Sequence, residues 1–171
     1  MASRSRERLY VTVGTTKFDS LIKEIASSHI LAALKKLGFC EVILQIGRGD
    51  YIPEDIELSA NTPKVSYYRF KDSTASDIAQ ADLVICHAGA GSIMDALGAG
   101  KSVLVVINEE LMGNHQIELA EKLAKESFLN YCTVSRLQES LESIDMSKLK
   151  PFPPGEPHKF VAYLDALLGF V

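Results

Sequence analysis

The sequence predicts an α/β domain built on a doubly wound, mostly parallel sheet. Short runs that are almost entirely apolar alternate with segments whose apolar residues recur at helical spacing. Several of these runs are followed by glycine-rich or polar segments, which are typical of the loops that connect strands to helices. With 171 residues, 47% of them hydrophobic and 23% charged, the chain has the size and composition of one domain with a buried core.

Six runs are expected as strands, and four segments between them as helices. The strands cover residues 9–13, 41–46, 65–70, 83–86, 102–107 and 131–134. The helices cover residues 18–34, 73–81, 93–99 and 116–125, the first of them closed by Gly38. This alternation is typical of a Rossmann-like fold, for which we expect the strand order 3-2-1-4-5-6.

The last part of the chain differs from the rest. Residues 1–150 are expected to form the domain, and residues 151–171 a proline-rich arm followed by an amphipathic helix. The apolar stripe of this helix consists of Phe160, Val161, Leu164, Leu167 and Leu168. Either the domain's own surface or a partner subunit covers this stripe, and the sequence leaves both alternatives open.

Charge and cysteine content exclude several classes of protein. A net charge of −4 offers no basic surface for a polyphosphate backbone, so no nucleic-acid partner is expected. Cys40, Cys86 and Cys132 are widely spaced, which predicts free core thiols in a reducing compartment. No apolar run is long enough to cross a bilayer, and we expect a cytoplasmic chain without a direct membrane span.

The residues that follow the first and fourth strands form the predicted site. In an open parallel sheet, ligands bind at the carboxyl ends of the strands where the strand order reverses, which here lies between these two strands. Gly14, Thr15 and Thr16 follow the first strand, and the segment 87–92 follows the fourth. Its small residues let the backbone approach an anion at a helix N-terminus, so a diphosphate is expected there. Close packing of strand against helix is the alternative explanation.

Five residues at or near this edge, His87 among them, are weighed between a functional and a structural role. His87 is either a structural residue whose hydrogen bonds are satisfied within the protein, or a residue that orients a leaving diphosphate. Asp95 is either a solvated helical residue or a ligand of a ribose. Asn114 is a common helix N-cap, whereas His115 and Gln116 lie where they would bond sugar hydroxyls. The first loop lacks the Gly-x-Gly-x-x-Gly pattern of dinucleotide sites, so NAD is not expected.

Four ordered motifs carry a family resemblance. They are VTVGTTKFD at residues 11–19, QIGRG at 45–49, DLVICHAGAGS at 82–92 and VVINEELMGNHQ at 105–116. Together they resemble the catalytic subunit of the two-subunit UDP-N-acetylglucosamine transferase of the dolichol pathway. The resemblance runs from about Leu9 to the terminal helix.

The resemblance implies a chain equivalent to the nucleotide-sugar-binding half of a GT-B glycosyltransferase, similar to the carboxyl half of the bacterial lipid II transferase. The implied reaction moves GlcNAc from UDP-GlcNAc to GlcNAc-diphosphate-dolichol, with inversion, on the cytosolic face of the endoplasmic reticulum. A membrane-anchored second subunit would be the partner. No metal or other cofactor is implied, because helix N-termini hold the diphosphate.

The resemblance also implies roles for particular residues. Gly14, Thr15 and Thr16 would line the diphosphate and acceptor side. Gly47 and the backbone around Phe70 would hold the uracil. Asp95 would bind the ribose, at a position where the family usually has Glu. Gly89, Ala90, Gly91 and Ser92 would surround the phosphates, and His115 with Gln116 would bind the sugar. His87, Ala88 and Asn114 would belong to the same donor-binding site. The catalytic base would be His87, His115 or Asp19, or a group of the partner. A regulatory module that binds UDP-sugars without turnover, and an epimerase of related fold, are the alternatives.

Overall fold

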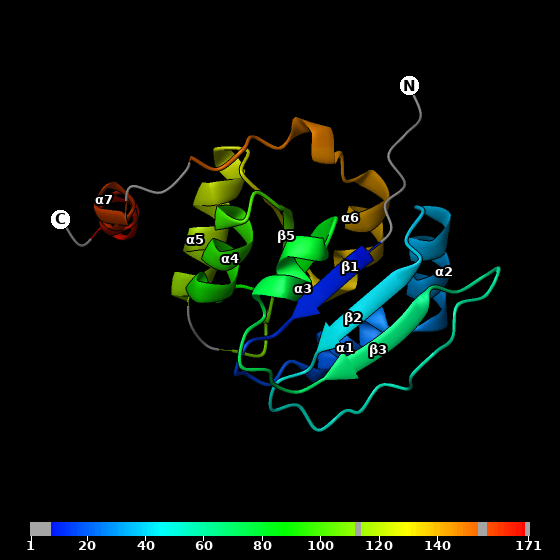
Figure 1. Ribbon diagram of the computed structural model, residues 1–171. Coiled ribbons are helices and arrows are strands. Elements are labelled where there is room, and N and C mark those ends of the chain that lie inside the picture. Colours follow the sequence, from blue (N-terminus) through cyan, green and yellow to red (C-terminus); the bar gives the residue numbers. More distant parts are fainter. Residues whose placement is uncertain (1–7, 112–113, 154–156, 170–171) are drawn as a thin grey trace.

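The computed structural model describes residues 8–111, 114–153 and 157–169. Its centre is a sheet of six parallel strands in the order β3-β2-β1-β4-β5-β6 (Figure 1). The strands are β1 (Arg8–Thr12), β2 (Glu41–Gln45), β3 (Lys64–Tyr68), β4 (Leu83–His87), β5 (Ser102–Ile107) and β6 (Asn130–Thr133). The predicted fold class and strand order are confirmed.

Helices cover both faces of this sheet, as its nearly all-apolar strands require. One face carries α1 (Asp19–Ile25), α2 (Ser28–Lys36) and α6 (Leu137–Ser143). The other face carries α3 (Ala75–Gln80), α4 (Ala90–Gly98) and α5 (Asn114–Lys125). Two short 3₁₀ turns, η1 (Val134–Arg136) and η2 (Met146–Lys148), flank α6.

The strands divide their side chains between two apolar cores. On β1, Leu9 and Val11 belong to the α1/α2/α6 side and Tyr10 to the α3/α4/α5 side, and all three are fully buried. On β4, Ile85 belongs to the α1/α2/α6 side and Cys86 to the α3/α4/α5 side. This two-sided burial holds the central strands rigidly, so the loops at their carboxyl ends start from a well-defined frame.

The predicted helix over residues 18–34 is wrong in one respect, because the structure has two helices there. Ser27 separates them with an extended backbone, at φ −67° and ψ 148°. Its hydroxyl donates to the carbonyl of Glu24 at 2.6 Å. A serine hydroxyl that bonds the backbone in this way competes with helix continuation, and apolar periodicity carries no signal of the break.

The terminal helix α7 (Pro157–Leu168) lies beside α5 (Figure 1). Leu164 packs against the apolar core of the α3/α4/α5 side, whereas Val161 is 55% exposed. Before this helix, Phe152 meets Phe128 edge-to-face, with ring centroids 5.1 Å apart. The domain's own surface therefore covers part of the apolar stripe and leaves another part uncovered. The side chain of Phe160 lies outside the described part of the structure.

One of the three cysteines departs from the expectation of core thiols. All three are free, and Cys86 and Cys132 are buried, but Cys40 is exposed. Cys40 precedes β2 in the turn after α2, where the chain crosses the surface between two elements. The apolar residues around Cys40 point into the core, but this position itself does not.

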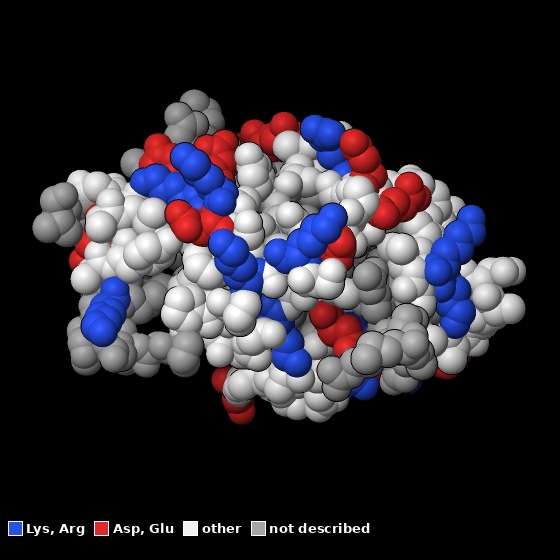
Figure 2. All heavy atoms as spheres, turned by 90° about the horizontal axis from the view of Figure 1, so that it is seen from above, with Lys and Arg blue, Asp and Glu red and all other residues white. Residues whose placement is uncertain are grey.

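The face seen from above in Figure 2 carries charges of both signs, and the described helices include no membrane-spanning element. Seen from the side at which the strands begin, Lys and Arg are interspersed with Asp and Glu (Figure 2). Within the described ranges, no helix combines the length and the apolar character that crossing a bilayer requires.

Candidate functional site

The loops after β1 and β4 meet at the carboxyl edge of the sheet. The two strands pair in parallel, with Thr12 opposite Cys86, so both loops leave the sheet side by side. A Cβ atom placed on Gly14 would lie 2.9 Å from His87 Cε1 and 3.6 Å from Ser92 Oγ. The structure therefore brings the first glycine loop and the segment 87–92 together, as the position of the switch point predicts.

Helix α4 begins three residues before its predicted start at residue 93, and this difference shapes the site. Its N-cap is Gly89, and no side chain caps the first turn. Ala90, Gly91 and Ser92 thus belong to that turn, where backbone N–H groups lack helical partners. A Cβ on Gly91 would meet nothing within 4 Å, so open space lies in front of the first turn. Such a helix end favours an anion.

His87 lies between the two glycine loops. Its side chain is buried, with 8% of the residue exposed. A Cβ on Gly89 would overlap the ring at Nε2, so only glycine fits beside it. Burial lowers the pKa of His87, and a contact with the backbone of Thr12 partly offsets this effect. The imidazole is therefore neutral near pH 7, and its buried Nδ1 has no hydrogen-bond partner.

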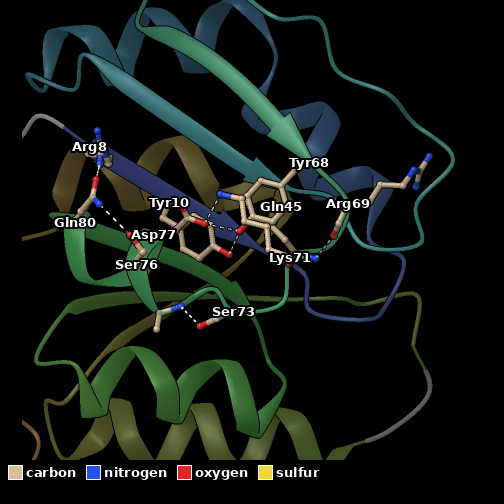
Figure 3. A network of polar contacts seen from close by, with 11 residues as sticks. Arg8, Tyr10, Gln45, Tyr68, Arg69, Lys71, Ser73, Ser76, Asp77 and Gln80 are labelled. Carbon is tan, nitrogen blue, oxygen red and sulfur yellow. Dashed lines mark hydrogen bonds and ion pairs between the residues drawn. The ribbon is translucent and has the colours of Figure 1, made fainter.

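Gln45 connects the first loop to the end of β3, a role that the sequence analysis missed. Its side chain is buried at the end of β2 (Figure 3). Oε1 accepts hydrogen bonds from Thr12 Oγ1 at 2.5 Å, Gly14 N at 2.9 Å and Val13 N at 3.2 Å. Nε2 donates to the carbonyls of Gly14 and Arg69, both at 2.7 Å. In the sequence, an amide residue directly after the apolar run of residues 42–44 marks this position, but not the bonds that it makes.

A second set of contacts secures the loop after β2. The carboxylate of Asp19 accepts the backbone N–H of Asp50 at 3.2 Å and that of Tyr51 at 3.3 Å. A Cβ on Gly47, whose φ is +57°, would overlap the carbonyl of Thr16. Asp19 and Gly47 thus both have a structural role. The resemblance implies a further role for each, as a candidate base for Asp19 and as a uracil contact for Gly47.

A cavity of about 490 Å³ opens beside the loop after β3. Lys71, Ser73, Thr74, Ile78 and Asp95 are among the residues that line it. Asp95 on α4, for which a ribose contact is predicted, thus borders the same cavity as the loop that follows Phe70.

A polar network buttresses the loop on one side of this cavity (Figure 3). The hydroxyls of Tyr10 and Tyr68 lie 2.9 Å apart, and Tyr68 donates to Asp77 Oδ2 at 2.7 Å. Lys71 Nζ lies 2.9 Å from the same carboxylate oxygen. Burial is the main cause that raises the pKa of both tyrosines, so they stay protonated and serve as hydrogen-bond donors.

The remaining predicted residues lie at the same edge of the sheet. Thr15 is exposed, and Thr16 Oγ1 donates to the carbonyl of Val13 at 2.8 Å. Phe70 is 52% exposed, and Gln116 is exposed in the first turn of α5. The side chains of Asn114 and His115 lie outside the described part of the structure, although both residues belong to α5.

Comparisons with known proteins agree with this architecture. The chain is 52% identical over 125 residues to the human protein named UDP-N-acetylglucosamine transferase subunit ALG13. A solution NMR structure of ALG13 superposes with a TM-score of 0.70 at 27% identity, and the match covers 96% of each chain. The crystal structure of Acinetobacter baumannii MurG matches with a TM-score of 0.58 at 20% identity; it covers 98% of this chain and 44% of MurG, and is a likeness of fold.

The strand order and the glycine-lined carboxyl edge define a Rossmann-like α/β domain, the class that includes the carboxyl halves of GT-B glycosyltransferases. The chain belongs to glycosyltransferase family 28, whose C-terminal domain matches residues 8–165. The resemblance to the UDP-N-acetylglucosamine transferase subunits is thereby confirmed. The chain spans 11% of the length of the human and mouse relatives.

Proposed function

We propose that this chain is the donor-binding, catalytic subunit of a transferase that moves GlcNAc from UDP-GlcNAc to GlcNAc-diphosphate-dolichol, with inversion at the anomeric carbon. The observation that carries the proposal is the uncapped first turn of α4 facing the Gly14 loop. The names of the relatives supply the donor and the word "subunit".

The proposed donor lies along the carboxyl edge of the sheet. Its diphosphate sits against residues 88–92, where the amides and dipole of α4 offset its charge without a metal ion. Asp95 binds the ribose from the wall of the cavity, and the backbone near Gly47 and Phe70 holds the uracil. His115 and Gln116, with Asn114 beside them in the sequence, are proposed to bind the sugar.

His87 is proposed to stabilise the departing UDP. Its ring lies beside both Gly14 and Gly89, where Cε1 and Nε2 face the two glycine loops. The catalytic base comes from His87, His115 or Asp19, or from the partner subunit. Since Asp19 already accepts two backbone N–H groups, variants of the two histidines are the first to measure. Loss of transfer with donor affinity retained would identify the base.

The partner is proposed to be a membrane-anchored subunit that supplies the lipid-acceptor surface. In this proposal the chain is cytoplasmic and is recruited to the cytosolic face of the endoplasmic reticulum through that subunit. The part of α7 that its own domain leaves uncovered offers a place for such contact.

The experiment that tests the function is radiolabelled GlcNAc transfer from UDP-GlcNAc to a lipid-linked GlcNAc diphosphate, with and without membranes that contain the partner. We expect transfer only when both are present, and we expect it to continue in EDTA. Donor binding without transfer under any condition would instead indicate a regulatory module. Conversion of UDP-GlcNAc by the chain alone would indicate an epimerase.

A further inference from the structure

Gln45 uses its entire side-chain amide on the loops of the proposed donor site. The carbonyl oxygen accepts three hydrogen bonds and the amide nitrogen donates two, which exhausts its two hydrogens. The residue is only 3% exposed. A buried polar side chain with every partner satisfied restricts its surroundings strongly, because each bond is costly to leave unmade.

The main target of these bonds is Gly14. Regular pairing of β1 with β2 ends at Thr12 opposite Gln45, so the peptide groups of Gly14 lie beyond the ladder. Gln45 binds both the N–H and the carbonyl of Gly14. Gly14 has a φ of +61° and faces the His87 ring. Gln45 thus binds both peptide groups of this left-handed turn, and Thr12 Oγ1 also accepts from the Gly14 N–H at 3.2 Å.

The same amide reaches a second loop. Nε2 also donates to the carbonyl of Arg69, which directly follows β3. The guanidinium of Arg69 in turn donates to the carbonyl of Gly47 at 3.1 Å and to that of Gly49 at 2.8 Å. Gln45 and Arg69 therefore join the loops after β1, β2 and β3.

We propose that Gln45 is a positioning residue for the donor. It sets the spacing between the Gly14 side of the site and the loop after β3, which the proposed function assigns to the diphosphate and the nucleoside respectively. Gln45 has no contact with the donor in this scheme and acts through the backbone of Gly14 and Arg69. The inference rests on the proposed function.

The test compares variants of the full chain, assayed with membranes that contain the partner. Gln45→Leu removes all five bonds, and Gln45→Glu keeps an acceptor while removing the amide donor. Thr12→Val removes the hydroxyl that bonds both Gln45 Oε1 and the N–H of Gly14, and Thr12→Ser restores it. Val42→Ala on the same strand, fully buried and at its other end, is the control for lost stability.

Two measurements are taken for each variant: the donor KM and kcat, and hydrogen exchange at the Val13 and Gly14 amides. We expect both Gln45 variants to raise the donor KM about tenfold or more and to speed exchange at the two amides. Thr12→Val is expected to do so partially and Thr12→Ser to recover. Val42→Ala is expected to lower stability and leave both readouts unchanged.

The proposal is overturned if exchange at Gly14 matches the unmodified chain in both Gln45 variants. It is also overturned if the donor KM follows stability alone, so that Val42→Ala behaves like Gln45→Leu. Should Gln45→Leu fail to fold, Gln45→Glu decides, because the Thr12 hydroxyl also bonds the Gly14 amide directly. If the unmodified chain does not bind UDP-GlcNAc, that result contradicts the proposed function. Amide exchange alone then decides whether Gln45 fixes the conformation of the Gly14 loop.

Discussion

At the residue scale, the two glycines of the segment 87–92 serve different purposes. Gly89 makes room for the His87 ring, whereas Gly91 faces open space at the first turn of α4. In the sequence they are two equivalent small residues. Only the position of the imidazole separates the glycine needed for packing from the glycine available to a ligand.

This difference makes Gly91→Val the sharper test of the diphosphate site. We expect the free energy of unfolding to change by about 0.5 kcal/mol or less, because the added side chain meets no neighbour. Its branched carbons would fill the space in front of the first turn, so affinity for UDP should fall about tenfold or more.

Calorimetric titration with UDP measures this effect, and Gly98→Val is the matched control. Gly98 closes the same helix and also has nothing within 4 Å of an added Cβ. Equal UDP affinity in the unmodified chain and Gly91→Val would place the diphosphate elsewhere.

His87 makes stability depend on pH. Because burial lowers its folded-state pKa, the unfolded chain binds a proton more readily than the folded one. The contribution of His87 to the free energy of unfolding is therefore fully present above the unfolded-state pKa of about 6.5. It is lost as the pH falls from there through the folded-state pKa.

Thermal unfolding at a series of pH values between 8 and 5 measures this dependence. We expect His87→Gln to flatten the decline relative to the unmodified chain, since glutamine does not titrate. Parallel curves for the two proteins would contradict a buried, neutral His87.

At the scale of elements, the sequence predicts the positions of the strands better than the points at which helices begin or break. The predicted strands lie within a few residues of the observed ones, because apolar runs are set by burial on both faces of the sheet. The start of α4 and the break at Ser27 depend on backbone hydrogen bonds. Hydrophobic periodicity does not report such bonds.

Helix α7 offers a prediction at this scale, since its two apolar sides have different surroundings. Leu164 packs on the α3/α4/α5 core, whereas Val161 is largely exposed. Leu164→Asp should lower the free energy of unfolding by about 1–2 kcal/mol. Val161→Asp should leave it nearly unchanged and weaken association with the proposed partner.

Urea unfolding and co-purification with the membrane subunit provide the two readouts. A Val161→Asp variant that keeps full association would remove this side of α7 from the proposed interface. The division of the chain at residue 150 stays a prediction, although Phe152 and Leu164 both contact the domain.

At the scale of the whole molecule, the sheet is the frame on which the site depends. Ile85 lies on the central strand β4 and is fully buried, whereas Ile52 in the loop after β2 is 46% exposed. Ile85→Ala should cost about 2–5 kcal/mol, and Ile52→Ala about 0.5 kcal/mol or less. Equal midpoints in urea for the two variants would contradict the described core.

By itself, the sequence determined the class of fold and, with the strand order usual for that class, the edge at which the two glycine loops meet. These follow from apolar periodicity and from the rule that parallel strands place their carboxyl ends together. The roles of Gln45, Arg69 and Asp19 were decided only by the tertiary structure, because each bonds backbone groups at least 20 residues away. Such bonds depend on where the folded loops lie, and no local pattern in the chain encodes them.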